Sequence, residues 1–282
     1  MNSSHGTRIA LGTAMMTVFV GIVALDLFLD TDVGLGCTGV LIGTVGLLEF
    51  YDITGKKGFD PFRLSGIVGG ILVFVTCWSE ARSSGSISLN PSLLFAIVCW
   101  LFLLQGFTRG LENIVENISI TVFGILYVFF FLSFAMAIRH LPGGNGLIML
   151  FGIILIAKCT DIGAYFVGKE FGSKKIFPTI SPNKTLEGLI GGLTTGMLVA
   201  VVWNLVPQIK ILPLVWAVPF GLLIGVVSVG GDLAESMLKR DAGVKDSGNL
   251  IPSFGGVLDV MDCVLASLPV GYYFLLFYGW NA

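Results

Sequence analysis

The chain has 282 residues, of which 55% are apolar and 12% charged, with a formal net charge of −2 and a mean hydropathy of +0.91. Soluble domains are about 25% charged, so a chain this poor in charge cannot cover a folded body with polar surface, and its solvent is expected to be lipid. The net charge argues against a nucleic-acid partner, which requires a basic face. We therefore expect an all-α, polytopic integral membrane protein in which residues 1–282 form a single membrane-embedded domain.

The cysteines and histidines do not indicate a metal centre of their own. Five cysteines are scattered through apolar segments without a Cys-x-x-Cys pair, and His5 and His140 lie in a tail and a loop. Such spacing argues against a zinc site and favours buried, inert thiols. The first apolar run follows Arg8 without a small-residue cleavage site, so we interpret it as a retained span and not as a signal peptide.

Long apolar stretches recur along the whole chain. A membrane-spanning helix needs about 20 largely apolar residues. The third and fourth stretches are short and the sixth is polar at its end, so eight or ten spans are alternatives to nine. We expect residues 1–145 to form a lipid-side scaffold and residues 146–282 to carry the catalytic groups. The nine candidates are 9–29, 33–50, 64–80, 91–107, 118–138, 146–168, 185–206, 211–231 and 257–279.

The distribution of basic residues predicts the orientation. Lysine and arginine are enriched in the short cytoplasmic loops of membrane proteins. Nine spans that start from a cytoplasmic N-terminus place twelve basic residues inside and three outside, the three being Arg82, Arg139 and Lys210. We therefore expect an odd number of spans and charge-rich loops that face the cytoplasm.

Few ionisable residues lie in or near the earlier apolar stretches. Asp26 and Glu49 lie near the ends of spans and are expected to be interfacial, not catalytic. The loop 51–63 mixes lysines with phenylalanines, which suits contact with anionic headgroups but is also typical of a plain cytoplasmic loop. Lys158 and Asp161 share a helix face in the sixth span. They either pair with each other, or Asp161 lines a polar cavity with carboxylates from later in the chain.

Residues 177–192, FPTISPNKTLEGLIGG, surround the start of the seventh span. Pro178 and Pro182 prevent a regular helix before the span begins, and Ser181 and Lys184 lie close to its start. Unpaired backbone N–H groups, a hydroxyl and a lysine make a phosphate cradle one interpretation. A simply capped helix start is the other.

The stretch Asp232–Asp262 concentrates charge between the last two apolar runs. Asp232 and Glu235 are one helical turn apart, as are Asp259 and Asp262. Paired carboxylates on a helix face suit Mg²⁺, which takes one or two carboxylates and completes its shell with water and phosphate. Nine of the chain's charged residues lie here: Asp232, Glu235, Lys239, Arg240, Asp241, Lys245, Asp246, Asp259 and Asp262.

The segments around these carboxylates complete the predicted site. The basic residues between the two pairs can neutralise phosphate oxygens. Gly255 and Gly256 let the backbone turn sharply and approach a ligand closely. The pattern predicts an enzyme site at a membrane surface, with carboxylates for a divalent cation and basic groups for phosphates.

This stretch resembles the signature of the phosphatidate cytidylyltransferases (CDP-diacylglycerol synthases). The upstream segments CTDIGAYFVGKEFG and SPNKTLEG are similar to two further motifs of that family, whereas the first 150 residues match only in hydropathy. Phe254 stands where the family usually has histidine and Val260 where it has arginine, so a catalytic role for that histidine cannot apply and one basic contact is missing. The matching signature positions are Ser236, Lys239, Arg240, Lys245, Asp246, Pro252, Gly255, Gly256, Asp259 and Asp262.

The resemblance implies that CTP and phosphatidic acid react to give CDP-diacylglycerol and pyrophosphate at the cytoplasmic face of the inner membrane, in phospholipid biosynthesis. It implies Mg²⁺, with K⁺ as a second cation. Asp232 and Asp259 are the implied metal ligands, and Asp161 and Asp262 are ligands or partners of ligands. A homodimer is a further expectation, since faces of small residues are abundant. The catalytic group would comprise Asp232, Asp259, Asp262, Lys239 and Arg240, and the substrate-binding group Ser181, Lys184, Lys245 and Asp246.

Two other functions stay open at this point. A CTP-dependent lipid kinase of the polyprenol or phytol type could share the nucleotide site, but there an alcohol attacks the γ-phosphorus and CDP is released. An ion-coupled transporter also places carboxylates in membrane helices, although more often near mid-membrane on broken helices within inverted repeats.

Overall fold

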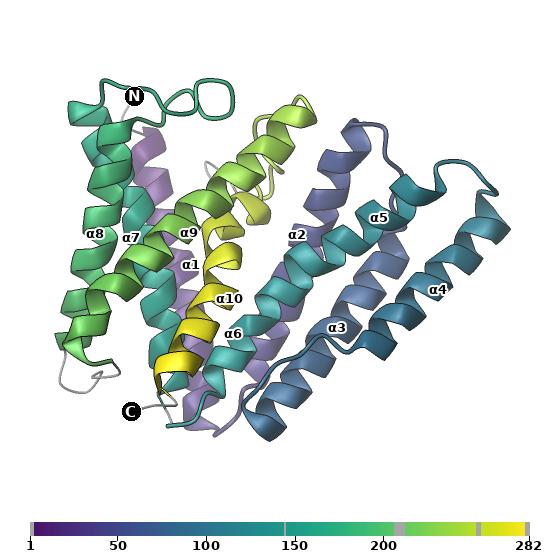
Figure 1. Ribbon diagram of the computed structural model, residues 1–282, viewed down its shortest axis with the longest axis horizontal. Coiled ribbons are helices and arrows are strands. Elements are labelled where there is room, and N and C mark those ends of the chain that lie inside the picture. The colour runs from purple at the N-terminus through teal and green to yellow at the C-terminus, as the bar shows by residue number, and fades with distance from the viewer. Residues whose placement is uncertain (1–2, 144, 206–211, 252–254, 280–282) are drawn as a thin grey trace. The chain divides into compact units, whose positions relative to one another are not determined.

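The computed structural model describes residues 3–143, 145–205, 212–251 and 255–279. Lys210, Pro252 and Phe254, which the sequence analysis singled out, lie outside the described residues. Within the described ranges the backbone is helical and forms no strand, which confirms the all-α class (Figure 1). The elements are α1 (Ser3–Phe28), α2 (Val33–Lys56), α3 (Arg63–Ser84), α4 (Pro91–Thr108), α5 (Ile114–Gly124), the π-helical segment η1 (Ile125–Phe130), α6 (Phe131–Arg139), α7 (Gly146–Phe171), α8 (Leu186–Leu205), α9 (Leu214–Asp241) and α10 (Val257–Gly279).

Each expected span falls on a helix. Eight helical segments of the described chain are long and apolar enough to cross a membrane, when Ile114–Arg139 is counted as one. The remaining helix, α1, contains a shorter apolar run, Gly12–Phe28. The chain is thus a polytopic integral membrane protein. Length and composition assign eight spans among the described residues, and α1 is the helix at the position of the first of the nine expected spans.

Helix α9 is longer than the apolar run that predicted it. It continues past residue 231 to Asp241, because the charged segment is rich in residues with high helix propensity. It ends where Gly243 adopts a φ of +70°. The N–H of Val244 donates to the carbonyl of Lys239 at 2.9 Å, which is the bond of a Schellman cap. The extension keeps the charged residues from Asp232 to Arg240 in a regular helical register.

By packing, the chain forms two compact units, which are not consecutive halves of the sequence. The first comprises Met1–Trp78, Leu89–Met136 and Asp246–Val260, and the second comprises Ser79–Ser88, Ala137–Lys245 and Met261–Ala282. The expected single domain, with a scaffold of residues 1–145 and a catalytic part of residues 146–282, stays a prediction.

In the second unit α8 packs against α7 and α9, and Figure 1 shows these helices side by side. The contact face of α8 is a stripe of small residues at four-residue spacing, which lets helix backbones approach closely in lipid. The buried members of this stripe are Gly188, Gly192, Gly196 and Ala200. The close packing brings the start of α8 and its preceding loop beside the end of α7.

The first unit has an aromatic core centred on α2. Phe50 and Tyr51 are fully buried, and the hydroxyl of Tyr51 donates to the carbonyl of Thr121 on α5 at 2.9 Å. Asp26 on α1 is also buried and accepts hydrogen bonds from the N–H groups of Gly34 at 2.8 Å and Leu35 at 2.7 Å. It therefore satisfies N–H groups that the start of α2 would otherwise leave unpaired.

Candidate active site

Three carboxylates from two helices meet in the second unit. Asp232 and Glu235 lie one turn apart on α9, and Asp262 lies near the start of α10. One oxygen from each lies within 4.8 Å of the others. Glu235 is 0% exposed and Asp262 is 7% exposed. We call these three residues the carboxylate cluster. Grouped carboxylate oxygens of this kind are suitable ligands for a hard divalent cation.

A glycine allows the two helices to bring these carboxylates together. A Cβ atom at Gly231 would lie 2.6 Å from the backbone oxygen of Asp262 and 2.8 Å from the Cβ of Ala266. Neither atom can move without moving α10, so α9 and α10 can be this close only because residue 231 has no side chain. The next residue along α9 is Asp232, which is why its carboxylate reaches that of Asp262.

Two lysines pair with the carboxylate cluster. The Nζ of Lys184, from the segment before α8, lies 2.7 Å from Oδ2 of Asp232. On α9 itself, the Nζ of Lys239 lies 2.5 Å from Oε2 of Glu235, four residues away. Three carboxylates and two ammonium groups leave one negative charge in excess. This formal excess of negative charge suits a cation, and the two ammonium groups are of the kind that binds an anion.

Helix α7 contributes a second pair of ionisable residues beside the cluster. Asp161 interacts electrostatically with Lys158, Asp232 and Lys184. The Nζ of Lys158 donates to the sulfur of Cys263 at 3.1 Å and interacts electrostatically with Asp262 as well as Asp161. The electrostatic interaction with Lys158 agrees with the first interpretation of Asp161. A polar cavity shared with the later carboxylates stays a prediction.

The loop between α7 and α8 is fixed by side chains at both of its ends. Glu187, in the first turn of α8, accepts hydrogen bonds from the N–H groups of Ser173 at 3.0 Å and Lys174 at 3.2 Å. Thr185 accepts one from the N–H of Gly188 at 3.1 Å and so caps α8. The Nε of Arg240 donates to the carbonyl of Ile180 at 3.2 Å. The capped helix start is confirmed, and the phosphate cradle stays a prediction.

In the first unit, side chains accept hydrogen bonds from the N–H groups at the start of α10. Oδ2 of Asp259 accepts from the N–H of Gly256, and also from the N–H and hydroxyl of Ser247, each at 2.8 Å. Glu49 on α2 accepts from the N–H groups of Val257 at 2.9 Å and Leu258 at 2.7 Å. The N–H of Asp259 donates to the Ser247 hydroxyl at 3.3 Å. These side chains thereby satisfy four consecutive backbone donors, the N–H groups of residues 256–259.

The glycines before α10 serve this arrangement. Gly255 has a φ of +98°, so the predicted sharp turn is present. A Cβ at Gly256 would collide with the Ser247 hydroxyl and the Glu49 carboxylate. The backbone at Gly256 lies close to protein side chains, and the close approach to a ligand that the sequence indicated stays a prediction.

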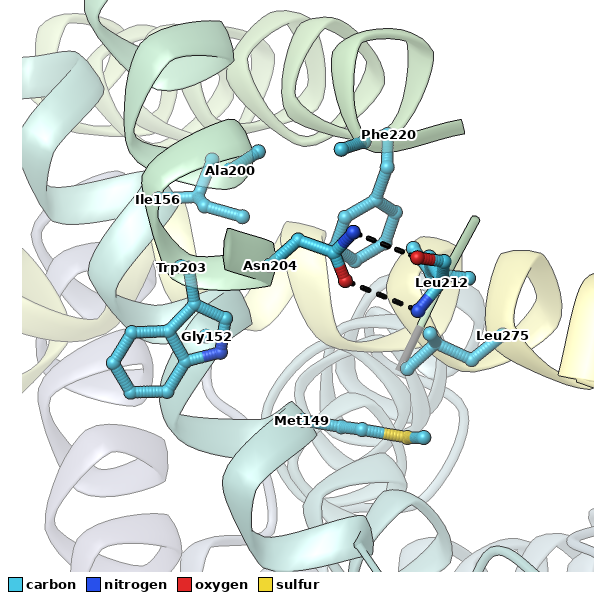
Figure 2. A pocket seen from close by; sticks show the side chains of 10 residues that line it. Met149, Gly152, Ile156, Ala200, Trp203, Asn204, Leu212, Phe220 and Leu275 are labelled. Atoms are coloured by element: carbon cyan, nitrogen blue, oxygen red, sulfur yellow. Dashed lines mark hydrogen bonds between the residues drawn. The ribbon is translucent and has the colours of Figure 1, made fainter. Parts of the chain in front are cut away.

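A separate pocket lies at the other end of α8 (Figure 2). The side-chain amide of Asn204 donates to the carbonyl of Leu212 at 2.6 Å and accepts from its N–H at 3.1 Å. The described lining, which includes Met149, Trp203 and Phe220, contains no acidic or basic side chain. This pocket has no group for phosphoryl chemistry, so the carboxylate cluster is the better candidate site.

Comparison with known proteins identifies the family. A sequence model described as the cytidylyltransferase family matches residues 6–278. The chain belongs to the cytidylyltransferase family. Membership makes it a nucleotidyltransferase, and its apolar helices make it a membrane enzyme.

Relatives of this cytidylyltransferase align along most of its length. The phosphatidate cytidylyltransferase of Bacillus subtilis is 33% identical over 241 residues, 84% of this chain and 87% of the relative. That of Chlamydia pneumoniae is 31% identical over 285 residues, 95% of this chain and 91% of the relative. That of Synechocystis is 31% identical over 261 residues, 84% and 86% respectively. The resemblance inferred from the signature residues is confirmed.

The structure brings together part of the predicted site of this family member. The second unit groups Asp161, Lys184, Asp232, Lys239 and Asp262 around the carboxylate cluster. The N–H of Lys184 also donates to the carbonyl of Ser181 at 3.1 Å, so Ser181 lies in the turn that presents this lysine.

The remaining predicted residues have other surroundings. Lys245 and Asp246 are exposed in the segment after α9, and Arg240 is bonded to loop carbonyls. Asp259 belongs to the first unit, so its convergence with Asp232 stays a prediction.

Two residues that contact Asp259 or its helix were missed by the sequence analysis. Glu49 was expected to be interfacial, yet it is 7% exposed and bonded to the start of α10. Its position at the end of an otherwise apolar run was the available signal. Ser247 carried no signal, because a single serine in a polar loop is ordinary.

Proposed function

We propose that this chain catalyses the phosphatidate cytidylyltransferase reaction, in which CTP and phosphatidic acid give CDP-diacylglycerol and pyrophosphate. The observation that carries the proposal is the carboxylate cluster with its two paired lysines, Lys184 and Lys239. It lies in a chain whose relatives of similar length bear the name of that enzyme. Such a group can bind a cation and a polyphosphate together.

The carboxylate cluster fits Mg²⁺. Its three residues each direct one oxygen to a common region, and two of them are buried, as expected of a dedicated ligand set. Asp232, Glu235 and Asp262 would hold the ion, with Asp161 beside them. When bound there, Mg²⁺ would neutralise charge on the transferring phosphate. We propose Asp259 as a further ligand and K⁺ as a second cation.

The reaction needs positioning more than it needs a base. A phosphatidate oxygen forms a bond to the α-phosphorus of CTP, and the bond from that phosphorus to the pyrophosphate oxygen breaks. The attacking phosphate is already ionised near neutral pH, so no side chain has to remove a proton. What the protein supplies is alignment and charge neutralisation.

The lysines and arginines supply that charge. Lys184 and Lys239 are paired with Asp232 and Glu235 in this structure. With a divalent cation in the cluster, both ammonium groups would be available to the triphosphate, and the net charge of the three carboxylates with their cations would be unchanged. Arg240 and Lys245 lie further along the same segment and can bind the lipid phosphate. Ser181 and Asp246 are proposed as additional substrate contacts.

The site is proposed to face the cytoplasm from the inner membrane, with the N-terminus in the cytoplasm. The support is the twelve-to-three distribution of basic residues between alternate loops. In this position CTP arrives from water while the acyl chains of phosphatidic acid stay in the bilayer. We also propose a homodimer, because small-residue helix faces are abundant in the chain.

The test uses the purified full-length protein in mixed micelles with phosphatidic acid and CTP labelled at the α- or the γ-phosphate. We expect α-label in the lipid product and γ-label in pyrophosphate. In a parallel assay with a polyprenol as the lipid acceptor, a CTP-dependent lipid kinase would instead transfer γ-label to the alcohol and release CDP. Retention of both labels in the aqueous nucleotide would contradict an enzymatic role with this substrate.

A matched pair of variants on α9 accompanies the assay. Asp232→Asn should abolish turnover, since it removes a carboxylate of the cluster. Asp241→Asn, at the exposed end of the same helix, should retain wild-type turnover. Excess EDTA should stop the wild-type reaction, and turnover that persists in EDTA would contradict the metal assignment.

A further inference from the structure

Glu49 lies in α2, far in sequence from every residue of the proposed site. Its side chain is 7% exposed. Oε1 accepts from the N–H of Val257 at 2.9 Å, and Oε2 accepts from the N–H of Leu258 at 2.7 Å. All of these residues belong to the first unit. A carboxylate from one helix therefore fixes the first turn of another, and that turn carries Asp259.

Glu49 also lies against the residue that binds the Asp259 carboxylate. Its Oε2 is 3.2 Å from the hydroxyl oxygen of Ser247, and the same hydroxyl is 2.8 Å from Oδ2 of Asp259. A hydroxyl has one hydrogen to donate. The shorter distance makes Asp259 the principal acceptor and Glu49 the secondary acceptor, so the Ser247 hydroxyl lies between two carboxylates that both orient it.

Three donors then fix one oxygen of Asp259. Oδ2 accepts from the Ser247 N–H, the Ser247 hydroxyl and the Gly256 N–H. With the helix axis fixed by Glu49 and Oδ2 fixed by these donors, the direction of Oδ1 is determined. A carboxylate whose second oxygen is oriented in advance loses less freedom when it binds a cation.

The glycines at 248 and 256 indicate that this contact is closely fitted. A Cβ at Gly248 would lie 2.7 Å from Oε1 of Glu49, and one at Gly256 would collide with the Glu49 carboxylate. At both glycines the segment before α10 therefore approaches Glu49 as closely as backbone can.

We propose that Glu49 is a positioning residue for Asp259, acting through Ser247 and the first turn of α10. The inference rests on the proposed function, because it assumes that Asp259 takes part in cation binding there. Glu49 itself does not touch the substrates. Its carboxylate sets the geometry of a residue that does the chemistry, and this role is distinct from general stability.

Asp26 provides a matched control in the same unit. It is 6% exposed and accepts two backbone N–H groups at the start of α2, as well as the hydroxyl of Thr31 at 3.0 Å. Glu49→Gln and Asp26→Asn each replace one carboxylate oxygen with an amide N–H that faces a donor. The two variants should therefore lose similar stability, and only their effects on the cation should differ.

The experiment measures Mn²⁺ binding to the full-length protein without substrates, the Mg²⁺ concentration for half-maximal turnover, and the melting temperature in detergent. Glu49→Gln should weaken Mn²⁺ binding and raise the Mg²⁺ requirement, each by about tenfold or more, the usual effect of removing a partner of a metal ligand. Asp26→Asn should lower the melting temperature by a similar amount with cation binding unchanged. Equal shifts in both variants, or no shift in Glu49→Gln, would overturn the proposal.

A second variant keeps the test decisive if Glu49→Gln does not fold. Ser247→Ala leaves the two N–H bonds to Glu49 in place and removes the hydroxyl between the carboxylates. We expect the same change in cation dependence with a smaller loss of stability, and a wild-type cation dependence would refute the inference. Failure of the proposed function would look different, because the wild-type protein itself would then lack cation-dependent turnover.

Discussion

The Nζ of Lys184 lies 2.7 Å from Oδ2 of Asp232, so the two residues form an ion pair. Each of them is predicted to bind a different ligand. The lysine precedes α8 and suits phosphate, and the aspartate lies on α9 and suits a cation. Their pairing neutralises both while neither ligand is bound. Binding of the cation and of the nucleotide should therefore depend on each other.

Lys184→Met tests this dependence. Removing the ammonium group should lower kcat/KM for CTP by about tenfold to a hundredfold, the range expected for a lost charged hydrogen bond. It should also tighten Mn²⁺ binding in the absence of CTP, because Asp232 loses its competing partner. Lys174→Met in the same loop, whose side chain is exposed, is the control and should change neither quantity. Weaker Mn²⁺ binding in Lys184→Met would contradict this account.

The buried pair of Glu235 and Lys239 should be coupled in stability. Their side chains are 0% and 10% exposed, and removing one partner of such a pair costs about 3–5 kcal/mol. Glu235→Gln and Lys239→Met should each destabilise the protein strongly, and the double variant should lose much less than the sum. Denaturation of all four proteins in one detergent system measures the coupling, and simple additivity would refute it.

Adjacent glycines on α9 should respond in opposite ways to alanine. Gly231→Ala forces α9 and α10 apart, and overpacking of this kind costs about 1–3 kcal/mol. It should also weaken Mn²⁺ binding, since Asp232 and Asp262 separate. Nothing lies within 4 Å of a Cβ built at Gly230, so Gly230→Ala should be neutral or stabilising by about 1 kcal/mol. Equal behaviour of the two variants would show that the helix crossing does not require Gly231.

Asp259→Asn should abolish turnover while leaving the protein folded. The remaining side-chain oxygen can still accept the N–H bonds of Ser247 and Gly256, so the melting temperature should stay close to that of the wild type. Turnover should be abolished, because the charge proposed to bind the cation is lost. Asp52→Asn, which removes an exposed ion pair with Arg63, is the control on the same unit. Wild-type turnover in Asp259→Asn would remove this residue from the proposed site.

The amino-acid sequence was sufficient for the class, the family and much of the chemistry. Low charge and recurring apolar runs determine a helical membrane protein, because backbone groups in lipid must be bonded within their own segment. The spacing of Asp232 and Glu235 predicted a shared helix face. The signature residues predicted the family, since they recur at fixed spacing whatever the surrounding lipid-facing residues are.

The tertiary structure decided what those residues contact. In the structure Lys184 forms an ion pair with Asp232. The absence of a side chain at Gly231 lets α10, with Asp262, pack close to α9. Glu49 accepts hydrogen bonds from the first two N–H groups of α10. No sequence pattern within a single segment predicts these contacts, because each contact joins elements that are distant in sequence and whose approach depends on packing. An acidic residue near the end of an apolar run is equally compatible with a membrane interface and with a buried cap, and only the position of the neighbouring helix distinguishes the two.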